Sequence, residues 1–560
     1  MKRRFRVLSL ALLSLVLAVA IGACGGGEGG GQQGGGSGTK GASGQVKQGG
    51  EMVYTLTSFP DFLDPALSYT VEGWETLWLV YTPLLTYPHE SGAAGAKLIP
   101  GLAESLPKIS PDGTTYDLKL RSGMKYSDGS PVKASDFEHT IKRILKLESG
   151  GSAFYTGIKG AEEYVKGKDN DADITGIETN DETGDITITL NEPDGTFSNV
   201  LAMDFAGVVP GDTPFENMTK NPPPGTGPYK LANVTVGRQH QLERNPEFSI
   251  PGVPRGNLDQ ITIKVNKSTS RQAQDVITGQ TDGMDDPPPP DLLPQIRQQQ
   301  KDRYREEVTV STYYFFLNQR IKPFDNPKAR EAVNVGVDKP ALARLFGGLL
   351  APGCNFLPPG MPGYQRIEPC PWGNPNQPPD LNRARQLLQE SGEAGTEVTV
   401  YGNDEPETKR VTEAFADMLD QIGFKTQVKI LDGSVYFQAI GDQKTKAQAG
   451  FANWFQDFPH PANFMFLVNG KSIQPTNNQN FGNVDDPEIT QGIEDLKQEA
   501  DISKAAPQWA SLDRKLVERA HVVPYGHRKL TVFLGPKMNF AECSLFHPVY
   551  NKDFSSFCLK

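Results

Sequence analysis

Residues 398–430, VTVYGNDEPETKRVTEAFADMLDQIGFKTQVKI, determine the fold class of this chain. The stretch begins and ends with short β-prone runs, 398–401 and 424–430. Between these runs apolar residues recur at helical spacing until Gly423, which is a typical helix stop. A strand, a helix and a second strand in this order bring the two strands side by side in parallel. The sequence therefore predicts α/β structure for this part of the chain.

Strand signals also occur on the N-terminal side of this unit. Apolar residues alternate with polar ones, as in half-buried strands, at 51–57, 116–121, 185–190 and 261–265. The spacing of Ser135 and Glu138 predicts a capped helix that starts at Ser135. We expect a hinge in the long β-prone run at 308–317, where the chain leaves its first half. A second hinge is expected at Val522–Tyr525, where the chain returns to that first half.

The stretch 451–464, FANWFQDFPHPANF, combines aromatic rings, one carboxylate and two prolines. The prolines forbid a regular helix or central strand, so Asp457 lies on a stiff, irregular segment. Asp457 could meet a cationic ligand group, or it could cap a turn while the rings fill a core. Trp454 is the ring expected at a cleft. His460 could be a metal ligand or a general base, although a residue at the rim of the cleft is the simpler interpretation.

Composition restricts the class of protein. The chain has 560 residues, 37% of them hydrophobic and 22% charged, which is enough for two or three globular domains. The net charge is −11 and no block of Lys and Arg interrupts the globular part, so nucleic acid is not an expected partner.

The N-terminal residues predict an exported, lipid-anchored protein. A basic start precedes an apolar run at 7–21, and this pattern is typical of an export signal at residues 1–23. Ile21-Gly-Ala-Cys24 resembles the lipobox of bacterial lipoproteins, which implies cleavage before Cys24 and a lipid on its thiol. A plain secretory peptide is the alternative. The Gly-rich residues 24–50 predict a flexible tether, and no later apolar run is long enough to span a bilayer.

Four cysteines follow Cys24, and disulfides are expected in an oxidising compartment. Three pairings are possible. We expect Cys354 with Cys370 and Cys543 with Cys558, each closing a loop of about 15 residues and stabilising by roughly 3 kcal/mol in the chain-entropy model. A zinc site is the alternative interpretation, although no CxxC motif or nearby His accompanies these cysteines.

Motifs of catalysis are missing from the sequence. The globular part contains no G-x-S-x-G elbow, H-E-x-x-H helix, P-loop or G-x-G-x-x-G turn, and its seven histidines are scattered. We therefore expect neither an enzyme nor a bound cofactor or metal.

Several short blocks resemble one protein family. They are Pro100-Gly-Leu-Ala103, Gly123-Met-Lys-Tyr-Ser-Asp-Gly129, Ala134-Ser-Asp136, Gly225-Thr-Gly-Pro-Tyr229, Arg244-Asn-Pro246, Gly279-Gln-Thr-Asp282, Asn318 with Pro323-Phe-Asp325, Ala329-Arg-Glu-Ala332 and Pro359-Gly-Met-Pro-Gly363. In this order they are similar to the extracellular solute-binding protein family 5, which includes peptide- and nickel-binding components of ABC importers. The resemblance runs from about residue 51 to the C-terminus.

This resemblance implies an α/β, two-lobed periplasmic-binding-protein-like fold (type II, cluster C) with an extra subdomain inserted in the first lobe. The implied order after the tether is lobe I at 51–310, with the insertion at about 86–195, then lobe II at 311–522 and a return to lobe I at 523–560. Such a protein closes on its ligand by hinge motion.

The resemblance also implies a function and a site. The expected protein is a monomeric, extracytoplasmic lipoprotein that captures oligo- or dipeptides and delivers them to an ABC permease. Asp457 would pair with the α-ammonium of the peptide, beside Trp454, and Tyr54 and Thr55 are weaker cleft candidates. The same fold could instead bind an oligosaccharide or a nickel or other metal chelate. A surface lipoprotein that only mediates interactions is a third possibility.

Overall fold

The predicted strand-helix-strand unit is present in the computed structural model, which describes residues 46–560 except 148, 434 and 500. It consists of β15 (Glu397–Asn403), α11 (Pro406–Ile422) and β16 (Lys425–Leu431). The two strands are parallel, with Val400 opposite Val428, so the prediction is confirmed. Gly423 ends the helix in the left-handed region at φ 117°, where a side chain would be strained. The predictions for residues 1–23, Cys24 and most of the tether fall outside the described residues.

One continuous path of paired strands runs through the molecule. Its order is β16, β15, β17 (Ala449–Phe455), β13 (Ser311–Leu317), β18 (Val523–Leu534), β11 (Gly283–Met284), β1 (Glu51–Leu56), β10 (Gln260–Val265), β9 (Gln239–Arg244) and β8 (Tyr229–Thr235). The 12-residue strand β18 lies in the middle of this path and joins its two halves. Its first half pairs with β13 and with β14 (Leu350–Pro352), and its second half pairs with β12 (Tyr304–Val308) and β11.

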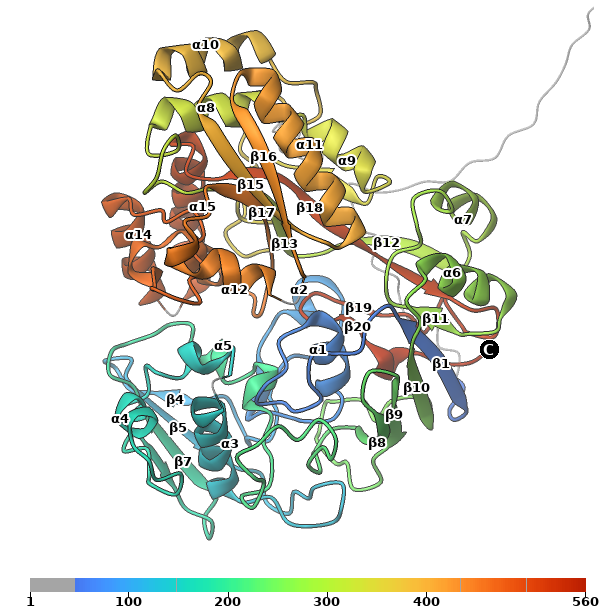
Figure 1. Ribbon diagram of the computed structural model, residues 1–560. Coiled ribbons are helices and arrows are strands. Elements are labelled where there is room, and N and C mark those ends of the chain that lie inside the picture. The colour runs from blue at the N-terminus through green and yellow to red at the C-terminus, as the bar shows by residue number, and fades with distance from the viewer. Residues whose placement is uncertain (1–45, 148, 434, 500) are drawn as a thin grey trace, which may run out of the picture. The chain divides into compact units, whose positions relative to one another are not determined.

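Two large hydrophobic cores lie on either side of this junction. The first contains apolar residues between Met52 and Ile263 together with the C-terminal segment, and the second contains residues between Val310 and Tyr525. In the second, α8 (Pro327–Gly336) and α10 (Leu381–Ser391) pack together beside α11, as Figure 1 shows. One residue departs from this division, because Phe458 follows β17 but packs in the first core. The boundaries predicted at residues 310 and 522 stay a prediction.

A separate four-stranded antiparallel sheet lies in the N-terminal half. Its order is β4 (Lys108–Ile109), β5 (Thr115–Lys119), β7 (Asp185–Thr189) and β6 (Ile177–Thr179). The helix α3 (Ala134–Lys146) lies beside it in Figure 1. This helix starts one residue before the predicted cap Ser135. Asp136 accepts the hydrogen bond from the Lys133 amide at 2.9 Å, while the hydroxyl of Ser135 donates to Asp181 instead.

Both sequential disulfides are present, Cys354–Cys370 and Cys543–Cys558. The first organises the Pro- and Gly-rich loop that follows β14. Its sulfur atoms pack against Val517, and the indole nitrogen of Trp372 donates to the Val517 carbonyl at 2.7 Å. The long loop is therefore tied to the body of the second core.

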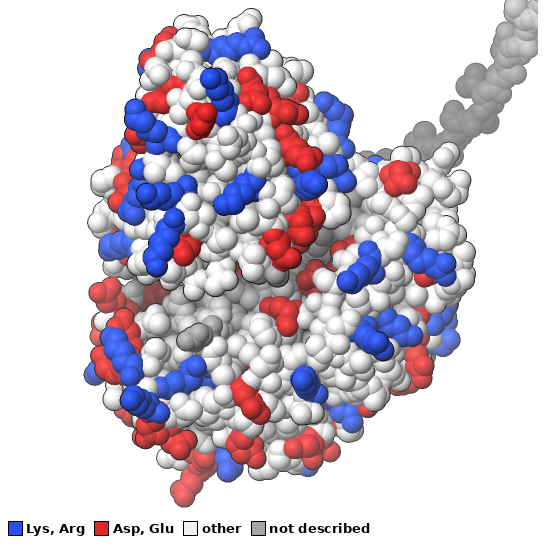
Figure 2. Space-filling view, viewed as in Figure 1, with Lys and Arg blue, Asp and Glu red and all other residues white. Residues whose placement is uncertain are grey.

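Charged side chains of both signs are interspersed over the face shown in Figure 2, and a hollow crosses that face. Among residues 46–560, apart from the three gaps, no helix is both long and apolar enough to cross a bilayer.

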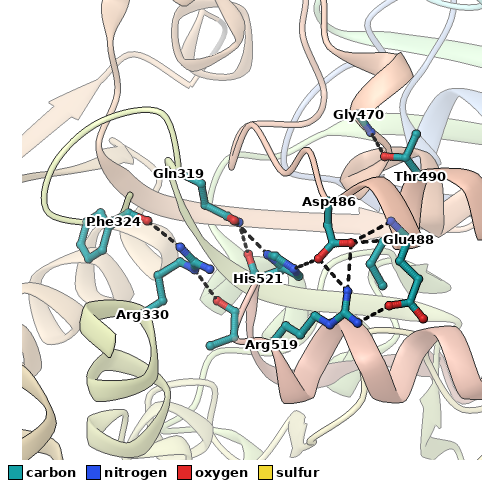
Figure 3. A network of polar contacts seen from close by, with 11 residues as sticks. Gln319, Phe324, Arg330, Gly470, Asp486, Glu488, Thr490, Arg519 and His521 are labelled. Carbon is teal, nitrogen blue, oxygen red and sulfur yellow. Dashed lines mark hydrogen bonds and ion pairs between the residues drawn. The ribbon is translucent and has the colours of Figure 1, made fainter. Parts of the chain in front are cut away.

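A polar network joins two helices to the start of β18 (Figure 3). Asp486 caps α14 (Pro487–Lys497), and its carboxylate accepts hydrogen bonds from Arg519 at 2.8 and 2.9 Å. Arg519 directly follows α15 (Ile502–Glu518) and also pairs with Glu488. The imidazole of His521 lies 3.1 Å from Asp486 and 2.9 Å from Gln319. These contacts fix the approach of the chain to β18.

The two ends of the described chain meet. The Lys47 ammonium donates to the Lys560 carbonyl at 3.0 Å, and the Gln48 side chain donates to Asn257 at 2.8 Å. Leu559 pairs with Met538 in an isolated bridge close to the start of β1.

Candidate functional site

A cavity of about 300 Å³ lies between the two cores. Five segments and Phe437 of α12 (Tyr436–Gly441) border it, and the segments are residues 69–74, 309–310, 453–457, 479–481 and 548–551. The first contains the start of α1 (Val71–Leu77), and the third contains the end of β17 and lies within the ring-rich stretch 451–464. Segments hundreds of residues apart in sequence therefore form one site.

Aromatic rings form much of the border: Tyr69, Trp74, Phe437, Trp454, Phe455, Phe481 and Tyr550. The Tyr69 ring stacks on Trp74 with centroids 5.7 Å apart and meets Trp454 edge-on at 6.4 Å. Such rings offer apolar area and π faces to a ligand, and the faces attract cations.

Among the described residues of this border, Asp457 is the one with an acidic or basic side chain, and it is 6% exposed. Its Oδ2 atom accepts hydrogen bonds from the Asn463 amide at 2.7 Å and from the Tyr69 hydroxyl at 3.1 Å. Asn463 lies in the short helix α13 (Ala462–Met465) and also accepts from the Asp457 backbone amide at 2.8 Å. The carboxylate is held by neighbours from both sides of the cavity.

The environment disfavours the charged form of this carboxyl group. Burial raises the pKa of Asp457 to about 7, and the hydrogen bonds from Asn463 and Tyr69 only partly oppose that rise. Within the described chain, no Lys, Arg or His forms an ion pair with it. A ligand cation would supply the missing partner and would favour the ionised form.

Trp454 borders the cavity as expected and is half-buried. Its indole nitrogen lies 3.4 Å from the Asn463 side-chain oxygen, so it faces the same residue that holds Asp457. Phe455 also borders the cavity, whereas Phe458 is buried in the first core, 6.2 Å from the ring of Phe154.

The structure places Tyr54 and Thr55 away from the cavity border. Tyr54 is 1% exposed, its ring contacts Phe554 at 4.9 Å, and its hydroxyl donates to the Met284 carbonyl at 2.9 Å. The Thr55 hydroxyl lies 3.1 Å from the Gln272 side chain. Both residues lie on the interior strand β1, between β10 and β11, so their side chains are covered by neighbouring parts of the fold.

His460 is 3% exposed, so it is a buried residue and not a rim residue. Its Nδ1 atom accepts from the Ala462 amide at 3.1 Å, and its ring meets Trp509 edge-on. Burial lowers the pKa of His460 to about 4, which keeps the ring neutral at physiological pH. Within the part of the chain that the structure describes, no group of three or more His, Cys, Asp or Glu side chains is arranged to hold a metal ion.

The sequence did not predict the two hydrogen-bond partners of Asp457, nor the border rings Trp74, Phe437, Phe481 and Tyr550. Tyr69 lies 388 positions from the carboxylate that it contacts, so no local pattern connects them. Asn463 stands six positions after Asp457 and was part of the singled-out stretch, but its role as a hydrogen-bond partner depends on the turn between them.

Solved structures with the same fold define the class of protein. The chain aligns with the clavulanic acid biosynthesis oligopeptide binding protein 2 at TM-score 0.82 and 26% identity, covering 92% of this chain and 96% of that one. It aligns with Haemophilus influenzae OppA in complex with RPPGFSPFR at TM-score 0.71 and 20% identity, with 92% and 100% coverage. Helicobacter pylori DppA in complex with the peptide STSA gives TM-score 0.74 and 21% identity, with 92% and 98% coverage. The fold is that of a two-lobed periplasmic binding protein, as the sequence predicts.

Residues 97–475 match the family described as bacterial extracellular solute-binding proteins, family 5 Middle. Because the match covers more than half of the chain, this protein belongs to that family. The glutathione-binding protein GsiB of Shigella flexneri and that of Escherichia coli K12 are each 27% identical to it over 362 residues, 63% of this chain. The match spans 65% of those relatives, which is less than two thirds of their length.

Proposed function

We propose that this protein is the substrate-binding component of an ABC importer and that it captures short peptides by their free amino terminus. The ligand ammonium pairs with Asp457, and the aromatic border covers the first side chains of the peptide. The bound form is delivered to a membrane permease, and the chain itself performs no catalysis. Its place is outside the cytoplasm, as for its family.

One observation carries this proposal: a buried carboxylate at the cavity border without a cationic partner in the described chain. A buried charge is costly unless it is paired and hydrogen-bonded. Two hydrogen bonds already orient Asp457, so a ligand ammonium completes its environment at little cost in reorganisation. Several structural neighbours bind oligopeptides and GsiB binds glutathione, and these ligands support the same proposal.

The test is a thermal shift of the protein without residues 1–23. It is run with a mixed pool of di- to octapeptides and with the same pool after N-acetylation. A ligand at a hundred times its dissociation constant stabilises the folded state by about 2.7 kcal/mol. We expect a raised midpoint with free peptides and none with acetylated peptides.

Two variants connect that result to the site. Asp457→Asn keeps the shape of the side chain and removes its charge, so it should abolish the shift. Asp417→Asn removes the same charge from an exposed position on α11 and serves as the matched control. No shift with either pool, followed by a shift with oligosaccharides or metal chelates, would replace the peptide assignment with those ligands.

A further inference from the structure

Beyond Asp457, several acidic groups adjoin residues that border the cavity: Glu75 follows Trp74, and Asp285 pairs with Lys552, which follows Asn551. Glu72 lies beside Val71, which borders the cavity, and Asp286 lies close enough to raise the pKa of Glu72. Burial, then Asp285, contribute more to that rise, which takes the pKa of Glu72 to about 8. These four carboxyl groups belong to the first lobe.

The second lobe faces them with further carboxylates. Glu405 caps the start of α11, and its pKa is raised by burial first and then by Glu407, Asp404 and Asp286. Asp286 therefore acts on Glu72 in its own lobe and on Glu405 in the other. Acidic groups also border the hollow in Figure 2.

Each of the two nearby cations already forms an ion pair with a carboxylate. Lys552 is 1% exposed and lies 2.5 Å from Asp285 and 3.8 Å from Glu75. Arg528 donates from Nη2 to Glu407 at 3.1 Å, and its guanidinium lies over the Phe346 ring at 4.7 Å. Its Nη1 atom is buried without a partner in the described chain.

The raised pKa values of Glu72 and Glu75 keep both groups mostly protonated at pH 7. The charged groups that remain are Asp285, Asp286, Glu405 and Glu407 against Lys552 and Arg528. The described border of the cavity adds one more acid, Asp457, and no basic side chain. The ligand therefore enters a site with an excess of negative charge.

We propose that the cavity selects ligands of net positive charge, such as short peptide amides and other small amines without a free carboxylate, over the corresponding free acids. This selectivity rests on the proposed function, in which Asp457 binds the ammonium group of the ligand. The volume of about 300 Å³ is at the small end for ligand pockets, so the ligand is a compact one.

The physical reason lies in the other end of the ligand. A carboxylate that leaves water for this cavity loses its hydration, finds no free cation on the described border and is repelled by the flanking acids. A neutral amide at the same place avoids both costs. The repulsion acts over several ångströms and is weakened by salt.

The experiment uses four forms of one dipeptide, leucyl-alanine: the free form, the C-terminal amide, the N-acetyl form and the N-acetyl amide. Their dissociation constants are measured by calorimetry at pH 7 in 50 mM and 500 mM salt. We expect the free-amine amide to bind at least about tenfold tighter than the free-amine acid at low salt, and the ratio to shrink at high salt. Equal or tighter binding of the free acid overturns the inference.

The same four ligands separate this inference from the proposed function. If N-acetylation leaves binding unchanged, the role of the ammonium fails, and the proposed function fails with it. If acetylation abolishes binding but acid and amide bind equally, only the present inference fails.

Variants give a second, independent readout. The pair Asp286→Asn and Glu405→Gln should reduce the preference for the amide to about threefold or less and leave the need for the ammonium intact. Asp417→Asn changes the net charge away from the cavity and should leave the preference unchanged. If Arg528→Met instead selectively removes binding of the free acid, Arg528 binds the ligand carboxylate and the inference is wrong.

Discussion

The carboxylate of Asp457 combines two requirements that oppose each other in a folded protein. Its two hydrogen bonds favour the ionised form, while its burial favours the protonated form. The balance places its pKa near 7, so the empty protein holds this group partly protonated at neutral pH. Binding of an ammonium then requires release of a proton, and affinity for a free amine should rise as the pH rises through about 7.

The same group makes stability depend on pH. The folded-state pKa of about 7 lies above the unfolded value near 4, so the folded state holds an extra proton between them. Wild-type stability is therefore lost as the pH rises through this window. Asp457→Asn removes the effect, and it should exceed the wild type in unfolding free energy by about 2–4 kcal/mol at pH 8 and by much less at pH 4.5.

Urea unfolding of the ligand-free protein at both pH values measures this difference. Asp417→Asn serves again as the control, because its exposed carboxylate should show no such pH dependence. An Asp457→Asn variant less stable than the wild type at pH 8 would contradict the expectation.

The local sequence pattern predicted those residues of the cavity border that are neighbours in the chain. It did not predict residues that come together only in the folded structure. Asp457 and Trp454 were predicted because rings, a lone carboxylate and prolines occur within a few positions. Tyr69 was not, because it stands 388 positions away from the carboxylate that it contacts and the contact forms only in the folded chain. Tyr54 was placed at the cleft from its position near the first strand, but in the structure its ring packs against Phe554 and Phe557 near the C-terminus.

At the scale of elements, the alternation and helix-stop signals closely predicted the strands β1, β5, β7, β10, β15 and β16 and the end of the helix α11. The order of strands was not predicted, because β18 pairs with elements on both sides of the junction and no local pattern specifies such long-range pairing. The segment that leads into β18 is held by a few polar and charged side chains around Asp486.

Asp486 stabilises the folded state in two ways, as the cap of α14 and through its ion pair with Arg519. The hydrogen bonds from Arg519, the Ile489 amide and His521 outweigh burial and lower the pKa of Asp486 to about 2. Because the folded-state pKa is depressed, this stabilisation is present above pH 4 and is lost as the pH falls towards 2.

Asp486→Asn should therefore lower the unfolding free energy by about 1–3 kcal/mol at pH 7. Chemical denaturation at pH 7 and at pH 3 checks it, and the difference from the wild type should narrow at the lower pH. Asp485→Asn, at an exposed neighbouring position, is the control. A loss at pH 3 as large as that at pH 7 would contradict the role of the charge.

At the scale of the whole molecule, direct contacts join the two lobes around the cavity. Tyr69 donates to Asp457, the Gln456 amide donates to the Pro548 carbonyl, and the Gly195 amide donates to the Lys497 carbonyl at 2.8 Å. Phe458 adds an apolar contact by packing in the first core. Hinge motion would break these contacts together.

Phe458→Ala should therefore weaken closure more than folding. We expect ligand affinity to fall about tenfold or more, because the closed form loses a buried ring. The ligand-free protein should lose less than the 3–5 kcal/mol typical of a core Phe→Ala change, since the ring is exposed when the lobes open. Calorimetry and urea unfolding measure the two quantities. A full loss of stability with unchanged affinity would make Phe458 an ordinary core residue.

The lipid anchor is the other proposal at this scale. If Cys24 carries the lipid, Cys24→Ser should move the protein from the membrane fraction to the soluble fraction of the extracytoplasmic space, with peptide binding unchanged. Immunoblots of the two fractions check this, and the mass of the mature N-terminus identifies the lipid. Wild-type protein found only in the soluble fraction would favour the plain secretory peptide.

Because Lys47 and Lys560 are in contact, the chain can be circularly permuted. A short linker could join these two positions without crossing the cavity, and new ends could be opened in the exposed turn around Gly237, between β8 and β9. Such a circular permutant keeps every strand pair of the sheet. Its new ends would provide an attachment point for a fluorescent reporter at that turn.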